Sequence, residues 1–341
     1  MPKVAVVILN WNGKTYLEQF LPLLVEYSDA DVEIIVADNA SSDDSVSFVQ
    51  QSLPNIRIIR NPKNEGFARG YNLALKQVKA DYYVLLNSDI EVTPNWIHPL
   101  ISLMESDPSI GACQPKIRSY HQRDEFEYAG AAGGFMDEFG YPFCRGRMFL
   151  TIEKDTGQYD DEVEISWATG ACLFVKSELF HLLGGFDEDF FAHMEEIDFC
   201  WRLHNFGYRV MYCPGSMVYH IGGGTLPKVS GRKTYLNFRN NFMLLYKNLP
   251  SKYLFKVFGT RVILDGVAAY KFLFQAGFKD FWAVAHAHIS FYKALPSLHR
   301  KRKQLKHGSM KMMYKRNIVA EYYLRGKRRF SELDPEKFFQ S

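Results

Sequence analysis

The chain has 341 residues, of which 47% are hydrophobic and 15% aromatic, and its formal net charge is only +3. This composition is that of a globular protein, long enough for one large or two smaller domains with a sizeable core. The charge is unevenly spread, because the segment from Arg300 to Arg329 holds twelve Lys or Arg residues and one acid, Glu321. A basic segment of this kind favours contact with an anionic membrane or nucleic acid, and a solvated basic face is the alternative.

The five cysteines are odd in number, and no two have C-x-x-C spacing, so neither a disulfide framework nor a zinc site is indicated. A reducing cytosol suits them best. The chain enters an apolar run at Val4 without a charged and then apolar signal region. Its most apolar late stretch, Leu254 to Phe278, is interrupted by charged residues, so we do not expect a membrane-spanning helix.

The first hundred residues alternate between strand-like and helical patterns. Strands are predicted at residues 4–9, 33–37, 55–59 and 82–86, with helices between them and a further helix starting at Pro94. Four strands alternating with helices over so short a distance predict a doubly wound α/β domain.

The pattern changes after Gly111. A short strand at 112–114 is followed by an irregular region, 118–161, which we interpret as substrate-facing loops or as a poorly packed excursion. The next expected elements are a strand at 165–175, a helix from Ser177, a helix in which Asp198 and Arg202 pair on the surface, strands at 210–213 and 218–220, a flexible stretch at about 222–233, and helices from Tyr235 onward.

Polar residues follow three of the predicted strands, at Asn10–Asn12, at Asp38 and at Asn87–Asp89. Ligands bind beyond the carboxyl ends of the strands in open α/β sheets, so we expect a nucleotide site there. No G-x-G-x-x-G follows the first strand and no P-loop is present, which disfavours a dehydrogenase or a P-loop kinase. The Asp38 carboxylate could hydrogen-bond a base or ribose edge. Asp89 suits a divalent ion that bridges two phosphates, although taken alone it is equally well a turn cap.

A pair of acids and a histidine are further candidates for a chemical role. Glu195 and Glu196 begin a helix, where they serve either as a general base or merely as favourable partners of the helix dipole. His220 follows a strand and precedes three glycines, so it is either a metal or phosphate ligand on a mobile loop or an ordinary strand-end histidine.

Six motifs occur in one order along residues 3–245. They are Val4–Gly13, Val36–Asp43, Asn64–Asn72, Leu85–Asp89, Gly185–Glu188 and Glu195–Asp198. Each is weak by itself, but the ordered set is specific. Together they resemble a family 2 glycosyltransferase of the bacterial rhamnosyltransferase-like branch.

The resemblance implies a GT-A type fold, with a mostly parallel central sheet flanked by helices, an inverting mechanism, and a nucleoside-diphosphate-sugar donor carrying UDP, dTDP or GDP. It also implies a divalent cation, Mg or Mn, bound by Asp89 at the last acid of the family's D-x-D element and by His220. Asn87 replaces the first acid of that element. Glu195 and Glu196 match the family's Glu-Asp pair, whose second acid is the usual base, so Glu196 is favoured over Glu195.

The same resemblance implies a set of donor-binding residues, with Asp38 on the nucleobase and the backbone near Leu9 and Trp11 forming the wall of that pocket. The full expected set is Leu9, Trp11, Asp38, Asn64, Gly66, Asn72, Asn87, Ser88, Asp89 and His220.

We therefore predict a catalytic domain at 1–245, with a nucleotide-sugar-binding half at 1–110 and an acceptor-side half at 111–245, followed by a helical, aromatic and basic extension at 246–341. The expected acceptor is a glycan or lipid-linked glycan of a surface polysaccharide. The extension either meets the cytoplasmic face of a membrane, packs on the catalytic domain or joins a homodimer, and no nucleic-acid-binding motif accompanies its charge. A sugar-nucleotide-binding or membrane-associated scaffold subunit without activity is the rival hypothesis.

Overall fold

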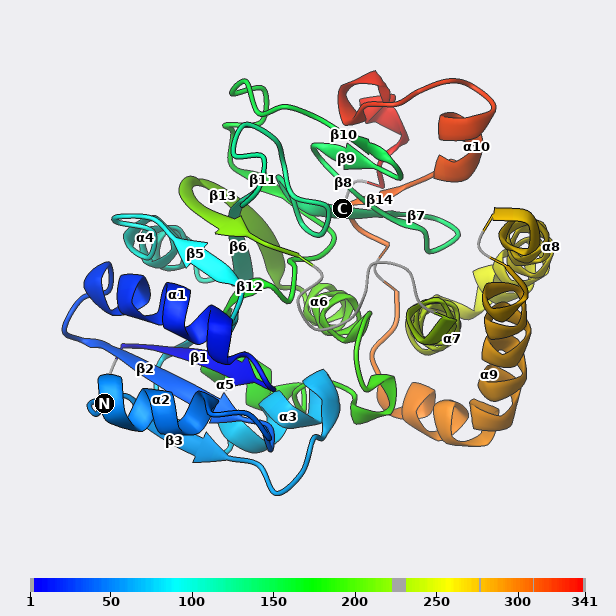
Figure 1. Ribbon diagram of the computed structural model, residues 1–341. Helices are drawn as coiled ribbons and strands as arrows, with labels where there is room; N and C mark the ends of the chain where they lie inside the picture. Colours follow the sequence, from blue (N-terminus) through cyan, green and yellow to red (C-terminus); the bar gives the residue numbers. More distant parts are fainter. Residues whose placement is uncertain (1–2, 223–230, 276, 309, 340–341) are drawn as a thin grey trace.

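A computed structural model describes residues 3–222, 231–275, 277–308 and 310–339. Its centre is a nine-stranded sheet in the order β11-β13-β6-β12-β4-β1-β2-β3, with β5 paired to β13 (Figure 1). In chain order these strands are β1 (Val4–Asn10), β2 (Val32–Asp38), β3 (Arg57–Arg60), β4 (Tyr82–Asn87), β5 (Ile90–Val92), β6 (Ile110–Ser119), β11 (Val163–Glu164), β12 (Cys172–Lys176) and β13 (Arg209–His220).

The strands β1 to β4 are parallel, and the predicted strands in this half are confirmed. Asn10 lies beside Asp38 in the pairing of β1 with β2, and Leu9 lies beside Asn87 in the pairing of β1 with β4. The polar residues after these three strands therefore meet at one sheet edge, as the sequence predicted. The other half of the sheet is mixed, since β12 runs antiparallel to both β4 and β6.

Alternate residues of each strand point to opposite faces, and helices cover both faces. Val4, Val6 and Ile8 of β1 pack beneath α1 (Lys14–Glu26), α2 (Ser45–Ser52) and α4 (His98–Ser106). Ala5 and Val7 face α3 (Gly66–Leu75), α5 (Ser177–Leu182) and α6 (Glu195–Asn205). The sheet thus holds its polar edge between two apolar layers.

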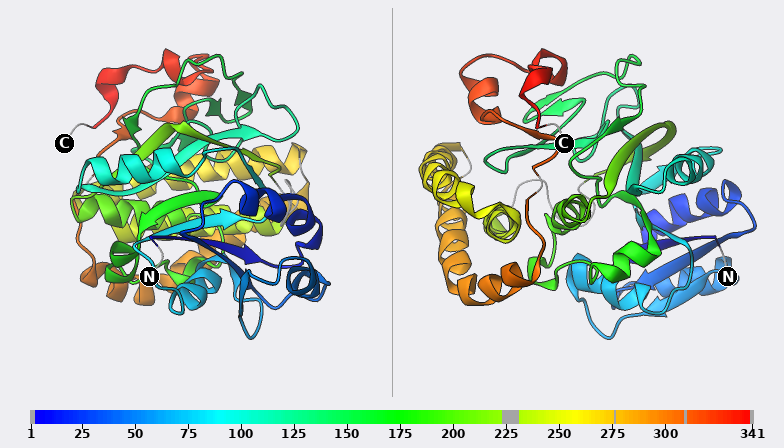
Figure 2. Two further views of the ribbon diagram at one scale, coloured as in Figure 1. Left: turned by 90° about the vertical axis from the view of Figure 1, so that its left-hand side faces the viewer. Right: turned by 180° about the vertical axis from the view of Figure 1, so that it is seen from behind.

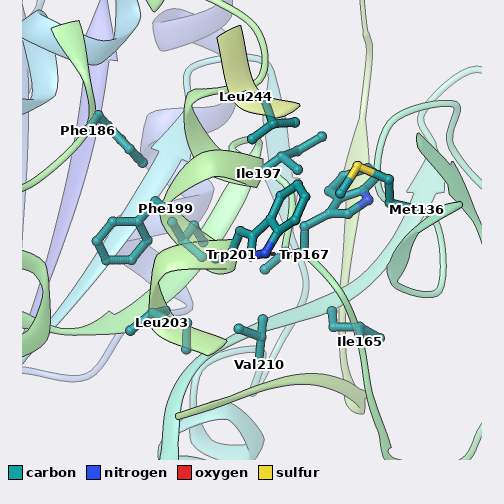
Figure 3. Packing of buried hydrophobic residues seen from close by; sticks show 14 of the residues in the cluster. Met136, Ile165, Trp167, Phe186, Ile197, Phe199, Trp201, Leu203, Val210 and Leu244 are labelled. Atoms are coloured by element: carbon teal, nitrogen blue, oxygen red, sulfur yellow. Dashed lines mark hydrogen bonds between the residues drawn. The ribbon is translucent and has the colours of Figure 1, made fainter. Parts of the chain in front are cut away.

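The helix α6 is the centre of the second layer. Figure 3 shows its Ile197 and Trp201 beside Trp167, with Leu244 above them. Trp167 donates its indole N–H to the carbonyl oxygen of Phe135 at 2.9 Å. Because these large side chains are buried on several sides, the start of α6 has little freedom to move.

A second sheet corrects our prediction of an irregular region at 118–161. It has the strand order β10-β9-β8-β7-β14 and joins residues from the middle and the end of the chain. Its strands are β7 (Gly134–Asp137), β8 (Pro142–Cys144), β9 (Arg147–Met148), β10 (Thr151–Ile152) and β14 (Met313–Tyr314). Strands of two to four residues are too short to produce a recognisable alternation, so the sequence pattern missed them.

Three smaller expectations were also wrong. Residues 209–220 form the single strand β13, irregular between Cys213 and Met217, rather than two strands. The helix predicted from Pro94 begins at His98, after a turn. Asp198 and Arg202 do pair, but in the interior, with exposed side-chain fractions of 0% and 6%. The predicted flexible stretch falls mostly on 223–230, outside the described residues.

The C-terminal part is helical up to residue 304 and mixed beyond it, which corrects the expectation of helix to the end. Its long helices are α7 (Gly231–Asn248), α8 (Ser251–Gln275) and α9 (Phe278–Gln304), and α10 (Ile318–Tyr323) follows β14. Short 3₁₀ turns lie at Glu188–Phe190, Phe330–Glu332 and Pro335–Lys337. No helix within the described residues is long and apolar enough to cross a membrane. The division predicted at residue 245 falls inside α7 and stays a prediction.

Candidate active site

The polar edge of the central sheet, formed by the ends of β1, β2 and β4, is closed on one side by the turn at Ser41–Ser42. Asp38 is 4% exposed, and its two carboxylate oxygens accept from the backbone N–H of Ser41 at 3.3 Å. Asn10 donates to the Ser41 hydroxyl at 3.1 Å, and Asn12 accepts from the backbone N–H of Ser42 at 2.7 Å. These bonds fix the turn beside Asp38 and satisfy only part of the carboxylate's capacity to accept.

The side chain of Asn39 connects this edge to the loop before α3. Its amide nitrogen donates to the Asn64 side-chain oxygen and to the Gly66 carbonyl oxygen, both at 3.1 Å. Its amide oxygen accepts from Asn61 at 3.1 Å and from the backbone N–H of Glu65 at 3.2 Å. The predicted residues Asn64 and Gly66 therefore lie at the polar edge, and Asn39 is the group that places them.

Gly66 makes a close contact that no other residue could make without a shift. Its φ is +73°, and a Cβ at this position would lie 2.6 Å from the Phe191 ring. The carbonyl oxygen of Phe191 accepts from the backbone N–H groups of Phe67 at 2.7 Å and Ala68 at 3.2 Å, at the start of α3. The segment before α6 is thereby bound to the same edge as Asp38.

Residues 191–194 have an uncommon backbone conformation, with φ of +65°, +71° and +75° at Phe191, His193 and Met194. Such angles are unfavourable for residues other than glycine and persist where neighbouring groups enforce them. Asn240 of α7 does so, since its buried amide nitrogen donates to the carbonyl oxygens of Phe190, Ala192 and His193 at 3.0, 2.8 and 2.7 Å. Nothing in the sequence marked Asn240 for this function.

Glu195 and Glu196 follow this segment directly and open α6. Burial raises the pKa of Glu195 well above its usual value, and the neighbouring Glu196 raises it further. Burial also raises the pKa of Glu196 to about 7, against hydrogen bonds from backbone N–H groups that lower it. Each side chain has one buried oxygen, Oε2, without a hydrogen-bond partner among the described residues. Glu195 is 3% exposed, whereas Glu196 is partly exposed, so a substrate can reach Glu196 more readily.

Asp198, only two residues further along α6, contrasts with this pair. Burial opposes its charge, but Lys247 and Arg202 hold its pKa below the usual value. Its oxygens accept from Lys247 at 2.8 Å, from Asn248 at 2.8 Å and from Arg202 at 2.9 Å. Asp198 is therefore a fully paired structural carboxylate, and it joins α6 to α7.

The side-chain amide of Asn72 forms its hydrogen bonds within the protein. Its amide oxygen accepts from the backbone N–H of Phe186 at 2.9 Å, and its amide nitrogen donates to the Phe186 carbonyl oxygen at 2.8 Å and to Glu188 at 3.2 Å. These bonds hold the Gly185–Glu188 motif against α3. A contact between Asn72 and the donor stays a prediction.

Asp89, in the turn after β4, lies beside His220 of β13, and Glu127 lies on the other side of the histidine ring. His220 is the last residue of β13 and is 6% exposed, so the expected strand-end position is confirmed and the mobile-loop alternative was wrong. Its Nε2 lies 3.2 Å from Asp89 Oδ1, and its Nδ1 lies 3.5 Å from Glu127 Oε2. Burial alone would lower the pKa of His220, but the two carboxylates raise it to about 10. Burial likewise opposes the charge of Asp89, and the imidazolium lowers its pKa.

Sequence reasoning missed Glu127, because it lies in a region where no periodic pattern was visible. It is 7% exposed, and His220 lowers its pKa although burial acts in the opposite direction. A carboxylate beside the second ring nitrogen is a common way to orient a metal-binding histidine. The described residues contain no cluster of three or more His, Cys, Asp or Glu side chains that could hold a metal ion. Asp89 and His220 are the two side chains here whose atoms suit a divalent cation, and their binding of one stays a prediction.

The remaining predicted residues lie around this edge. Trp11 is 42% exposed beyond the end of β1, and Leu9 is partly buried against the core. Asn87 is partly buried, with its backbone N–H donating to the Ala171 carbonyl oxygen at 2.9 Å, and Ser88 lies between it and Asp89. The structure therefore brings the ends of all three strands together, while the donor contacts of these residues stay predictions.

The family profile described as "Glycosyl transferase family 2" matches residues 5–178, just over half of the chain. The chain belongs to glycosyl transferase family 2. Among curated proteins it is similar to the N-acetylglucosaminyl-diphospho-decaprenol L-rhamnosyltransferase of Mycobacterium tuberculosis, with 28% identity over 233 residues, which are 63% of this chain and 75% of that protein. The resemblance to rhamnosyltransferases that the motifs indicated is thus confirmed.

Solved structures confirm the GT-A type fold of this family 2 chain. The structure of S. aureus TarS 1-349 in complex with UDP-GlcNAc matches with a TM-score of 0.57 at 14% identity, over 99% of both chains. The structure of GalNAc-T7 with UDP, GalNAc and Mn2+ matches with the same TM-score at 16% identity. It covers 74% of this chain, which spans about half of that structure.

Proposed function

We propose that this family 2 glycosyltransferase moves a sugar from a nucleoside-diphosphate-sugar to a hydroxyl of a glycan or lipid-linked glycan, with inversion, in surface polysaccharide biosynthesis. The observation that carries the proposal is Glu196. It is partly exposed, its pKa is raised to about 7, and it begins a helix whose preceding segment is bonded to the polar edge of the sheet. A carboxylate with a pKa near the operating pH suits general-base catalysis.

In the proposed step, Glu196 takes the proton of the acceptor hydroxyl while the hydroxyl oxygen bonds to the anomeric carbon. The bond from that carbon to the donor's diphosphate oxygen breaks on the opposite face, and the nucleoside diphosphate leaves. One displacement inverts the configuration, and no enzyme nucleophile is needed. Glu195 is buried and its pKa is raised well above the usual value, which favours its neutral form and lessens the negative charge beside Glu196.

The donor binds along the polar edge in this proposal. Asp38 accepts from the base, since its oxygens retain lone pairs beyond the bonds from Ser41. Asp89 and His220 would hold a divalent cation, Mg or Mn, which when bound would neutralise charge on the leaving diphosphate. Since a metal ligand must be the neutral imidazole, binding of the cation would displace the proton that His220 holds between Asp89 and Glu127.

The acceptor side rests on the relatives. The M. tuberculosis protein is named for an acceptor on decaprenyl diphosphate. The strands β7 to β10 lie on the side of α6 away from β1 (Figure 1), and the proposal places the acceptor on that side of α6. The sugar and the base of the donor are left to experiment, since UDP, dTDP and GDP all suit a carboxylate at Asp38.

The test is a thermal-shift screen of nucleoside diphosphates and their sugars, with and without Mn, followed by transfer assays with the donors that bind. Asp89→Ala should remove both turnover and the effect of Mn. Asp31→Ala, an exposed carboxylate at the opposite end of β2, is the matched control and should change neither. Full activity in Asp89→Ala would overturn the cation assignment. Nucleotide binding without turnover on any donor would instead favour a non-catalytic sugar-nucleotide-binding subunit.

A further inference from the structure

The hairpin of α8 and α9 has an apolar outer face. On α8 the exposed positions recur every three or four residues, so they form one continuous stripe. The large apolar side chains on this stripe are unusually exposed, with Phe255 at 94%, Ile263 at 69% and Phe274 at 71%. We define the hairpin face as Phe255, Val262, Ile263, Val267, Tyr270 and Phe274 of α8 with Phe278, Trp282, Ile289 and Tyr292 of α9.

The inner side of α8 has the opposite character. Arg261 and Asp265 are 2% and 0% exposed and form an ion pair at 3.1 Å. Arg261 also donates to the Phe139 carbonyl oxygen at 2.8 Å, and Asp265 accepts from Tyr141 at 3.2 Å and lies 3.2 Å from His288 Nε2. A helix that pairs charges inside and exposes aromatic and branched side chains outside has the reverse of the usual polarity. Its outer face therefore fits a surrounding other than water.

The charges on this hairpin have one sign at the surface. Between residues 251 and 308 the only acids are Asp265 and Asp280, and both are buried. The exposed charged residues of this segment are all basic, and one of them, Lys256, pairs with Glu138 at 2.8 Å. They are Lys252, Lys256, Lys271, Lys279, Lys293, Arg300, Lys303 and Lys306. An apolar stripe edged by cations alone complements a surface that is apolar within and negatively charged at its boundary.

A second copy of the chain fits less well. A two-fold interface brings the same patch against itself, so the lysines beside each stripe would face the lysines of the other copy. A layer of anionic lipid headgroups over acyl chains supplies both the opposite charge and the apolar interior.

We propose that the hairpin face docks on an anionic lipid bilayer, with α8 lying in the plane of the interface. No described helix could cross the bilayer, so the contact is interfacial. Figures 1 and 2 place the hairpin at the end of the molecule opposite β1, β2 and β3. The inference depends only on the hairpin and holds whether or not the proposed transfer reaction is correct.

The test is co-sedimentation of the full chain with vesicles of phosphatidylcholine alone and with added phosphatidylglycerol. We expect binding to the anionic vesicles that weakens with salt. The triple variant Ile263→Gln, Val267→Gln, Tyr270→Gln should lower the partition coefficient more than tenfold, because three exposed apolar groups no longer enter the interface. Each of Lys252→Gln, Lys271→Gln and Lys279→Gln should lower it about fivefold.

The matched control is the triple variant Val25→Gln, Leu182→Gln, Leu324→Gln. It makes the same kind of change at exposed apolar positions of other elements and should leave vesicle binding unchanged.

Brominated lipid should quench tryptophan fluorescence in the wild type and in Trp11→Phe, and much less in Trp282→Phe. Both tryptophans are exposed, but only Trp282 lies on the hairpin face. No binding to anionic vesicles, or equal binding by the two triple variants, would overturn the proposal. A wild-type dimer that the hairpin triple variant alone converts to a monomer would also overturn it.

Discussion

Two regions of the molecule bury charged groups: the start of α6 at the polar edge, and the hairpin of α8 and α9. They differ in whether those groups have hydrogen-bond or ion-pair partners. On the inner side of α8, Arg261 and Asp265 pair with each other. Arg261 also donates to the Phe139 carbonyl oxygen, and Asp265 lies beside His288. At the start of α6, Glu195 and Glu196 each keep a buried oxygen without a partner among the described residues. Complete pairing stabilises a fold, whereas an unpaired carboxylate is retained where a substrate supplies the partner.

Glu196→Gln gives the most direct test of this contrast. We expect turnover to fall about 10²–10⁴-fold, because the amide cannot accept the acceptor's proton, while donor binding is preserved. Transfer kinetics and donor titration measure the two effects separately. Glu195→Gln is the paired variant and should lose much less turnover. If the losses were the other way round, Glu195 would be the base.

Asp265→Ala should show the opposite result, a loss of stability. Arg261 would remain buried without its carboxylate, which costs about 3–5 kcal/mol of unfolding free energy. Urea denaturation measures this loss. The double variant Arg261→Met, Asp265→Leu should recover most of it, since no unpaired charge remains. A single variant as stable as the wild type would show that the pair does not hold α8.

Gly66→Ala tests how the segment before Glu195 is held. The φ of +73° and the contact with Phe191 both disfavour a methyl group, so we expect about 1–3 kcal/mol of destabilisation and reduced turnover. Thermal unfolding and kcat report the two effects. Gly266→Ala, on an open surface of α8 with no atom within 4 Å, should instead stabilise the protein by about 0.5–1 kcal/mol. Equal effects of the two substitutions would contradict the proposed contact.

The pH dependence is the finest test. The active form of Glu196 is unprotonated and its pKa is raised to about 7, so kcat/KM should fall about tenfold for each pH unit below that value. A pH profile of the wild type checks this. The residual activity of Glu196→Gln should not show the fall in kcat/KM below pH 7. A wild-type profile that stays level down to pH 5 would exclude Glu196 as the base.

The sequence was sufficient for the parallel half of the sheet, because each of its strands carries a local apolar run that ends in polar residues. It was also sufficient for the family, since ordered short motifs identify it, and the same motifs named Asp38, Asp89 and the Glu195–Glu196 pair as candidates whose functions stay predictions. It did not reveal the strands β7 to β10 and β14, which are too short to show a period and pair across distant parts of the chain.

Local patterns also cannot show which partners distant segments supply. Glu127 reaches His220, and Asn240 reaches the backbone of residues 190–193, only after the chain has folded. The sequence of α8 contains both charges and aromatic residues, and folding decided that the charges face inward. The sequence by itself therefore determined the family and named the candidate carboxylates. The tertiary structure decided which of those carboxylates remain unpaired and which face of the hairpin is exposed, because pairing and burial depend on contacts between segments far apart in the chain.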